Sequence, residues 1–132
     1  MKFVDTTFII ALLRGDKPTI DKAGELNDEG GAATTVINVY EAAYGVFRGM
    51  ADSPRRLMEL ERLLQSLDVF SLDYRAALRA AHISGELERK GIGIDPFDSL
   101  VAAIALVNGA DSLITRNITH FDKIDDLKTE TH

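Results

Sequence analysis

The sequence contains no cysteine, no histidine pair at the spacing of metal ligands, and no long uninterrupted apolar segment. Without cysteine, disulfide bonds and thiolate metal sites are excluded, and the chain fits the reducing cytoplasm, where we expect it. The apolar part of residues 1–16 is too short for a membrane span and lacks the small-residue cleavage site of a signal peptide. We therefore expect neither a membrane anchor nor a secretory leader.

An excess of basic residues is also lacking. Fifteen Lys and Arg face 21 Asp and Glu, which gives a formal net charge of −6. This balance argues against a protein that coats nucleic acid through a broad basic face. The negative net charge fits a crevice lined by carboxylates, which binds cations as counter-ions. The 132 residues, 45% apolar and 27% charged, predict a single globular domain over residues 1–132, without repeats or linkers.

Short apolar segments alternate with longer segments of helical periodicity. Strands are predicted at 2–5, 32–36, 69–72, 112–114 and 127–129, and helices after Asp5, from Lys17, from Asn38, after Pro54, after Asp73 and after Asp95. This alternation predicts an α/β fold with a parallel sheet and helices on both faces. Right-handed crossovers place the carboxyl ends of all strands along one edge, where ligands bind in such sheets.

Four polar side chains from remote segments are predicted to meet at that edge: Asp5, Glu41, Asp98 and Asn117. Asp5 ends the first strand, and Asn117 follows the strand at 112–114. Glu41 and Asp98 each lie three residues after a predicted helix cap, on the first turn of a helix. Carboxylates brought together raise one another's pKa unless a cation lies between them. Oxygen ligands of this kind favour Mg²⁺ or Mn²⁺, which can activate water against a phosphodiester.

A structural explanation competes with this one for each acid taken singly. A cap followed three residues later by an acid is the capping-box pattern, which fits Asn38 with Glu41 and Asp95 with Asp98. Asp5 alone fits a turn after a strand. Gly45 favours the functional interpretation, because a glycine inside a helix costs roughly 1 kcal/mol relative to alanine and leaves open space beside Glu41.

The motifs resemble those of PIN domains over nearly the whole chain, and most closely the VapC-type toxin ribonucleases of prokaryotic toxin–antitoxin pairs. The resemblance is carried by Asp5-Thr6-Thr7, Asn38-x-x-Glu41 with Gly45, Asp98-Ser99-Leu100-Val101-Ala102-Ala103, and Thr115-Arg116-Asn117. It implies a three-layer α/β/α sandwich that cuts RNA with one or two Mg²⁺ or Mn²⁺ ions. It also implies a homodimer that a cognate antitoxin protein inhibits.

Carried over to this sequence, the resemblance makes Asp5, Glu41 and Asp98 the metal-binding acids. Thr7 would support Asp5, and Thr115 would hold the carboxylates in place through its hydroxyl.

The fourth acid of many PIN domains is Asn117 here, which can orient a water or give one oxygen to a metal but adds no charge. A second tightly bound metal is therefore in doubt, and Asp122 is an alternative fourth group. Arg116 fits either a phosphate contact or an ordinary surface arginine. His120 fits a packed or solvated turn better than a general base.

Two other functions stay open from the sequence. An aspartyl phosphotransfer enzyme would also place Asp5 at the first strand end, but the second acid of such enzymes would fall on Thr7. A catalytically weak or inactive PIN-like domain that only binds a partner is compatible with Asn117. The apolar stripes Val39–Met50 and Leu57–Leu67 are predicted to pack in the core, and this helix pair can also form an antitoxin groove.

Overall fold

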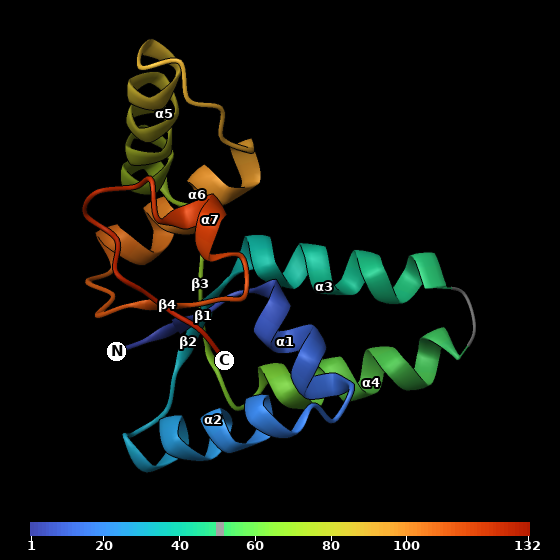
Figure 1. Ribbon diagram of the computed structural model, residues 1–132. Coiled ribbons are helices and arrows are strands. Elements are labelled where there is room, and N and C mark those ends of the chain that lie inside the picture. The colour runs from blue at the N-terminus through green and yellow to red at the C-terminus, as the bar shows by residue number, and fades with distance from the viewer. Residues whose placement is uncertain (50–51) are drawn as a thin grey trace.

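The structure is a computed structural model that describes residues 1–49 and 52–132. Within these ranges it has a parallel sheet of β1 (Phe3–Val4), β2 (Ala33–Thr35), β3 (Asp68–Phe70), β4 (Leu113–Ile114) and β5 (Thr129–Glu130). The strands lie side by side in the order β3-β2-β1-β4-β5 (Figure 1). The predicted parallel sheet is confirmed, including its last strand at the edge. β1 lies at the centre, so Asp5 leaves the sheet at its middle.

Several helices begin after an aspartate whose side chain caps them. They are α1 (Thr6–Leu13), α2 (Lys17–Asp28), α3 (Val36–Gly49), α4 (Ser53–Leu64), α5 (Tyr74–Arg89), α6 (Pro96–Val107) and α7 (Ile118–Phe121). Asp73 and Asp95 accept backbone N–H groups at the starts of α5 and α6, as predicted. The start of α3 differs from the prediction, since the helix begins at Val36 and contains Asn38. The hydroxyl of Thr35 accepts the backbone N–H of Asn38 instead.

Helices cover both faces of the sheet, which confirms the three-layer α/β/α sandwich. Neighbouring strand residues point to opposite faces, so Phe3 and Val4 of β1 enter different cores. Phe3 packs with residues of α5, α6 and α7, whereas Val4 packs with residues of α1, α2, α3 and α4. Figure 1 shows α5 and α6 above the strands and α2 below them.

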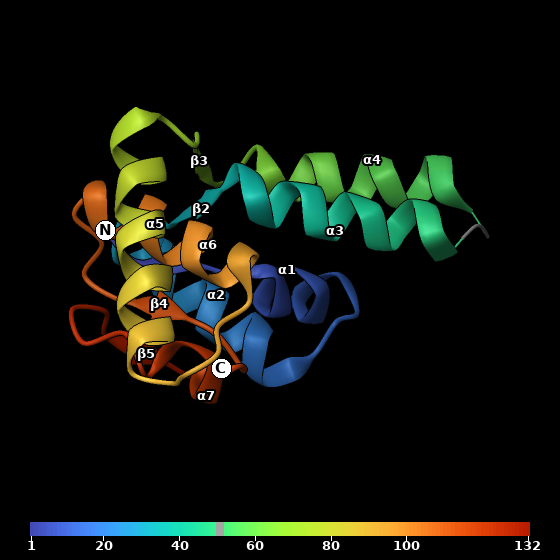
Figure 2. The same cartoon turned by 90° about the horizontal axis from the view of Figure 1, so that it is seen from above.

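α3 and α4 run side by side and project away from the sheet (Figures 1 and 2). On the predicted stripe of α3, Ala42 and Val46 are buried, but Phe47 is 57% exposed, so its placement in the core was wrong. The projecting end of α3 has no sheet beneath it to cover this side chain. Met50, at the end of the same stripe, lies outside the described residues. None of the helices in the described ranges combines the length and the hydropathy of a membrane span.

Candidate active site

Asp5 is a buried carboxylate at the carboxyl end of β1, with 3% of its surface exposed. Its Oδ1 accepts the hydroxyl of Thr7 at 2.5 Å and the backbone N–H groups of Thr7 and Phe8 at 3.0 and 3.3 Å. Its Oδ2 accepts the hydroxyl of Thr115 at 2.5 Å. Burial raises the pKa of Asp5, and these donors counteract that rise. The hydrogen bonds leave Oδ2 with one lone pair for a further partner.

Glu41 does not take part in the capping box that one interpretation of the sequence offered. Asn38 lies inside α3, and Oε1 of Glu41 accepts the hydroxyl of Thr6 at 2.7 Å, across from α1. The side-chain amide of Asn38 donates to the same Thr6 oxygen at 3.0 Å. The sequence alone does not predict this role for Thr6 or Asn38, because the contacts join residues 32 to 35 positions apart. Glu41 is therefore aimed at the start of α1, toward Asp5.

Asp98 lies on the first turn of α6, and its hydrogen-bond partner in the described structure is His120. Nδ1 of His120 lies 3.2 Å from Oδ2 of Asp98. The cap of α6 is Asp95, whose Oδ1 accepts the N–H of Phe97 at 2.8 Å, so Asp95 is a cap as expected. His120 is exposed, and the sequence alone does not predict its contact with Asp98. The contact depends on α7 lying beside α6 in the fold.

The acids share one electrostatic environment. Burial raises the pKa of Glu41, and the negative charges of Asp98, Asp5 and Asp95 raise it further. Burial likewise raises the pKa of Asp98, with Asp95 adding to the rise and His120 opposing it. The charges of Asp5 and Asp98 thus both act on Glu41 at this edge, and a cation beside these acids would relieve the repulsion.

The residues that follow β4 have different surroundings. Thr115 is fully buried and also accepts the backbone N–H of Asn117 at 2.9 Å. Asn117 is exposed and precedes α7, and Asp122 is exposed at the other end of that helix. Arg116 donates through Nη2 to Asp16 and through Nε to the backbone oxygen of His132. Roles for Asn117 and Asp122 in catalysis, and a phosphate contact of Arg116, stay predictions.

The chemistry of the donor set fits a hard divalent cation. Asp5, Glu41 and Asp98 offer carboxylate oxygens, which suit Mg²⁺ or Mn²⁺. Within residues 1–49 and 52–132, however, no three His, Cys, Asp or Glu side chains are already gathered as a metal cluster. Mg²⁺ usually keeps several of its waters and binds through only one or two carboxylates. The residues therefore fit such an ion in type and charge, without forming a closed cage.

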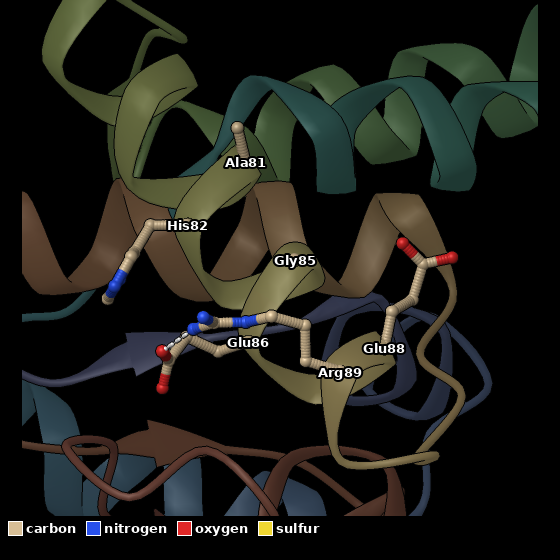
Figure 3. Close-up of a pocket in the computed structure, with 6 residues that line it drawn as sticks. All are labelled: Ala81, His82, Gly85, Glu86, Glu88 and Arg89. Carbon is tan, nitrogen blue, oxygen red and sulfur yellow. Dashed lines mark hydrogen bonds and ion pairs between the residues drawn. The ribbon is translucent and has the colours of Figure 1, made fainter.

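A hollow elsewhere on the surface is not lined by Asp5, Glu41 or Asp98. It has a volume of about 520 Å³ along one face of α5 and is lined by Ala81, His82, Gly85, Glu86, Glu88 and Arg89 (Figure 3). All six belong to a single helix, and Arg89 is paired with Glu86. None of the converging acids faces it, so we assign the candidate site to the sheet edge.

The aspartyl phosphotransfer alternative fits the geometry poorly. A nucleophilic carboxylate must reach its phosphate, but Asp5 is buried and accepts four hydrogen bonds. Thr7 stands where such an enzyme needs a second acid, and its hydroxyl donates a hydrogen bond to Asp5.

Comparisons with known proteins point to one family. A family model described as PIN domain matches residues 2–127. The tRNA(fMet)-specific endonuclease VapC of Shigella flexneri is 28% identical over 131 residues, which cover 98% of this chain and 97% of the relative. Ribonuclease VapC19 of Mycobacterium tuberculosis is 33% identical over 134 residues, covering 97% and 98%. The DNA-bound VapBC structure from Salmonella typhimurium has a TM-score of 0.87 at 28% identity, covering 99% and 98% of the two chains.

Proposed function

The chain belongs to the PIN-domain family and, within it, to the VapC ribonucleases, and we propose that it hydrolyses RNA phosphodiester bonds with Mg²⁺ or Mn²⁺ held by Asp5, Glu41 and Asp98. The observation that carries this proposal is that burial and then the charges of Asp98, on α6, and Asp5, at the end of β1, raise the pKa of Glu41 on α3. Uncompensated repulsion of this kind is costly unless a cation is bound there.

Each acid has a defined part in this mechanism. Asp5 would bind the ion through Oδ2, because Oδ1 already accepts three hydrogen bonds. Glu41 and Asp98 are half-buried, so their carboxylates would be open to an ion and to the RNA. A bound divalent ion supplies a hydroxide at neutral pH and neutralises charge on the phosphate. Thr6, Thr7 and Thr115 would hold the carboxylates in place through their hydroxyls.

We further propose that a cognate antitoxin protein covers the side formed by α1, α2 and α4, next to the projecting α3–α4 pair. A cavity of about 210 Å³ lies there, lined mainly by apolar residues including Phe8, Leu12, Leu26 and Leu63. An apolar side chain of an amphipathic segment fits such a groove. The chain would then be the toxin of a cytoplasmic toxin–antitoxin pair.

Self-association is a further part of the proposal. Tyr40 and Tyr44 of α3 stack at 6.0 Å, and Tyr40 meets Phe97 edge-on at 5.7 Å. These rings and Phe47 are each 40% to 57% exposed, which makes one aromatic face. Tyr40 and Phe97 directly precede Glu41 and Asp98, so a homodimer through this face would bring two acid edges together.

The test is a divalent-metal titration of RNA cleavage by the wild type beside Asp98→Asn. Initiator tRNA is the first substrate to use, because the Shigella relative is named for it. We expect cleavage that needs Mg²⁺ or Mn²⁺, stops in EDTA, and is abolished in the variant. Full activity in EDTA would refute the metal mechanism. A folded wild type that cleaves no RNA with either ion would favour an inactive, partner-binding domain.

A further inference from the structure

His132 lies against the start of α1, between two threonine hydroxyls that each serve a carboxylate. Its Nε2 is 3.3 Å from Oγ1 of Thr7, and its Nδ1 is 2.8 Å from Oγ1 of Thr19. Thr7 donates to Asp5 at 2.5 Å, and Thr19 donates to Oδ2 of Asp16 at 2.7 Å. The ring of Phe8 packs against the imidazole, with the centroids 5.2 Å apart. A side chain that no motif contains thus reaches the group that supports Asp5.

The hydrogen bonds of Thr7 determine that Nε2 of His132 carries a proton. Thr7 has a single hydroxyl proton, which goes to Asp5, and its oxygen already accepts the backbone N–H of Arg116 at 2.9 Å. The lone pair that remains can only accept, so Nε2 of His132 must be the donor. Thr19 also has one hydroxyl proton, which goes to Oδ2 of Asp16, and its oxygen accepts from Arg116 at 3.1 Å. The proton on Nε2 therefore follows from the contact with Thr7 alone. Asp16 also accepts from Arg116 and from the N–H of Thr19.

The surroundings of His132 shift its pKa and hold the residue in place. Burial lowers the pKa of His132, and the charge of Arg116 lowers it further, against an opposing effect of Asp16. Arg116 also donates to the backbone oxygen of His132 at 3.1 Å, and thereby fixes the residue at this place.

We infer that His132 is a positioning residue of the nuclease, whose Nε2–H holds the Thr7 hydroxyl so that its proton stays aimed at Oδ1 of Asp5. Oδ2 is thereby left as the oxygen that faces the ion. The inference rests on the proposed function of Asp5 as a metal-binding acid. It adds a residue that the four motifs do not include.

The first test uses cleavage of initiator tRNA and Mn²⁺ binding by calorimetry. In His132→Ala, kcat should fall and the Mn²⁺ dissociation constant should rise by about tenfold each, as is typical when a partner of a metal ligand is lost. KM for the RNA should stay the same. His132→Gln should recover most of both losses, because its amide nitrogen can take the place of Nε2. The matched control is His82→Ala on the exposed face of α5, which should change neither quantity.

Two further measurements separate positioning from a general loss of fold. In a Thr7→Val background, His132→Ala should cause no additional loss, because the contact through which it acts is gone. A long-range ¹⁵N spectrum of the metal-free wild type should show a proton of His132 on Nε2. An Nε2 without a proton, or a His132→Ala variant with wild-type kcat and Mn²⁺ affinity, would overturn the inference. A wild type that neither cleaves RNA nor binds Mn²⁺ would instead contradict the proposed function, while the tautomer still tests the contact.

Discussion

The hydroxyl of Thr115 donates a hydrogen bond to Oδ2 of Asp5 at 2.5 Å, across 110 positions of the sequence. The two residues follow β1 and β4, which are neighbours in the sheet, and the N–H of Asp5 bonds the carbonyl of Ile114 at 3.2 Å. This contact ties the most deeply buried acid to the last of the four motifs.

Replacing Thr115 by valine keeps the shape of the side chain and removes this donor. We expect the unfolding free energy to fall by about 1–3 kcal/mol, since a buried carboxylate loses one of its hydrogen bonds. Cleavage should fall by about 10- to 100-fold, because Asp5 is no longer held. Urea unfolding and initial rates measure the two effects, with the exposed Thr131→Val as control. Equal behaviour of the two variants would show that the contact has no role.

Glu41→Gln should alter the dependence of stability on pH. The pKa of Glu41 is raised in the folded state, so its contribution to stability is full below its ordinary value of 4.5 and is lost as the pH rises through the folded-state pKa. Gln keeps the acceptor for Thr6 without the charge. Without metal, the variant should match the wild type near pH 4 and exceed its stability at pH 7 by up to about 1 kcal/mol, after screening of a half-exposed side chain.

Chemical unfolding at both pH values, in EDTA, measures this difference, and Glu61→Gln on the exposed face of α4 is the control. A variant that is less stable than the wild type at pH 7 would mean that Glu41 is not strained by its neighbours.

Gly45→Ala tests whether the open space on α3 serves the substrate. No atom outside the helix lies within 4 Å of a Cβ built there, so alanine fits. Stability should rise by about 0.5–1 kcal/mol, as expected inside a helix. Cleavage should fall, because the added methyl enters the space beside Glu41. Gly85→Ala on α5 has equally open surroundings and should show the same gain in stability with unchanged cleavage. Unchanged cleavage in both would remove the functional interpretation of Gly45.

Tyr44→Lys tests the aromatic face as the site of self-association. A charge in the middle of the stack should yield monomers in light scattering, because a lysine ammonium is costly to bury between two copies. Tyr74→Lys replaces a tyrosine on α5 that is 79% exposed and should leave the oligomeric state unchanged. A wild type that is already monomeric at micromolar concentration would contradict the proposal.

Much of the fold could be predicted because its signals are local. The strands are short apolar segments, and Asp73 and Asp95 mark helix starts by the chemistry of their carboxylates. The start of α3 was misplaced, because the β-branched residues Thr35 and Val36 favour a strand locally. The order of the strands and the sides taken by the helices depend on packing between distant segments.

For the site, the sequence indicates which acids reach the sheet edge but not what each one contacts. Thr6 on Glu41, His120 on Asp98 and His132 on Thr7 all join residues from different elements. Such pairs have no periodicity or spacing that could reveal them. The structure was needed to show that the capping-box explanation of Glu41 is wrong.

The most direct test of the account is a calorimetric titration of Mn²⁺ into the wild type and into Asp5→Asn, Glu41→Gln and Asp98→Asn, with the exposed Asp125→Asn as control. The account predicts that the wild type and the control bind Mn²⁺ alike, and that each of the three variants binds at least about tenfold more weakly. Equal affinity in all five proteins, or no binding by the wild type, would contradict it.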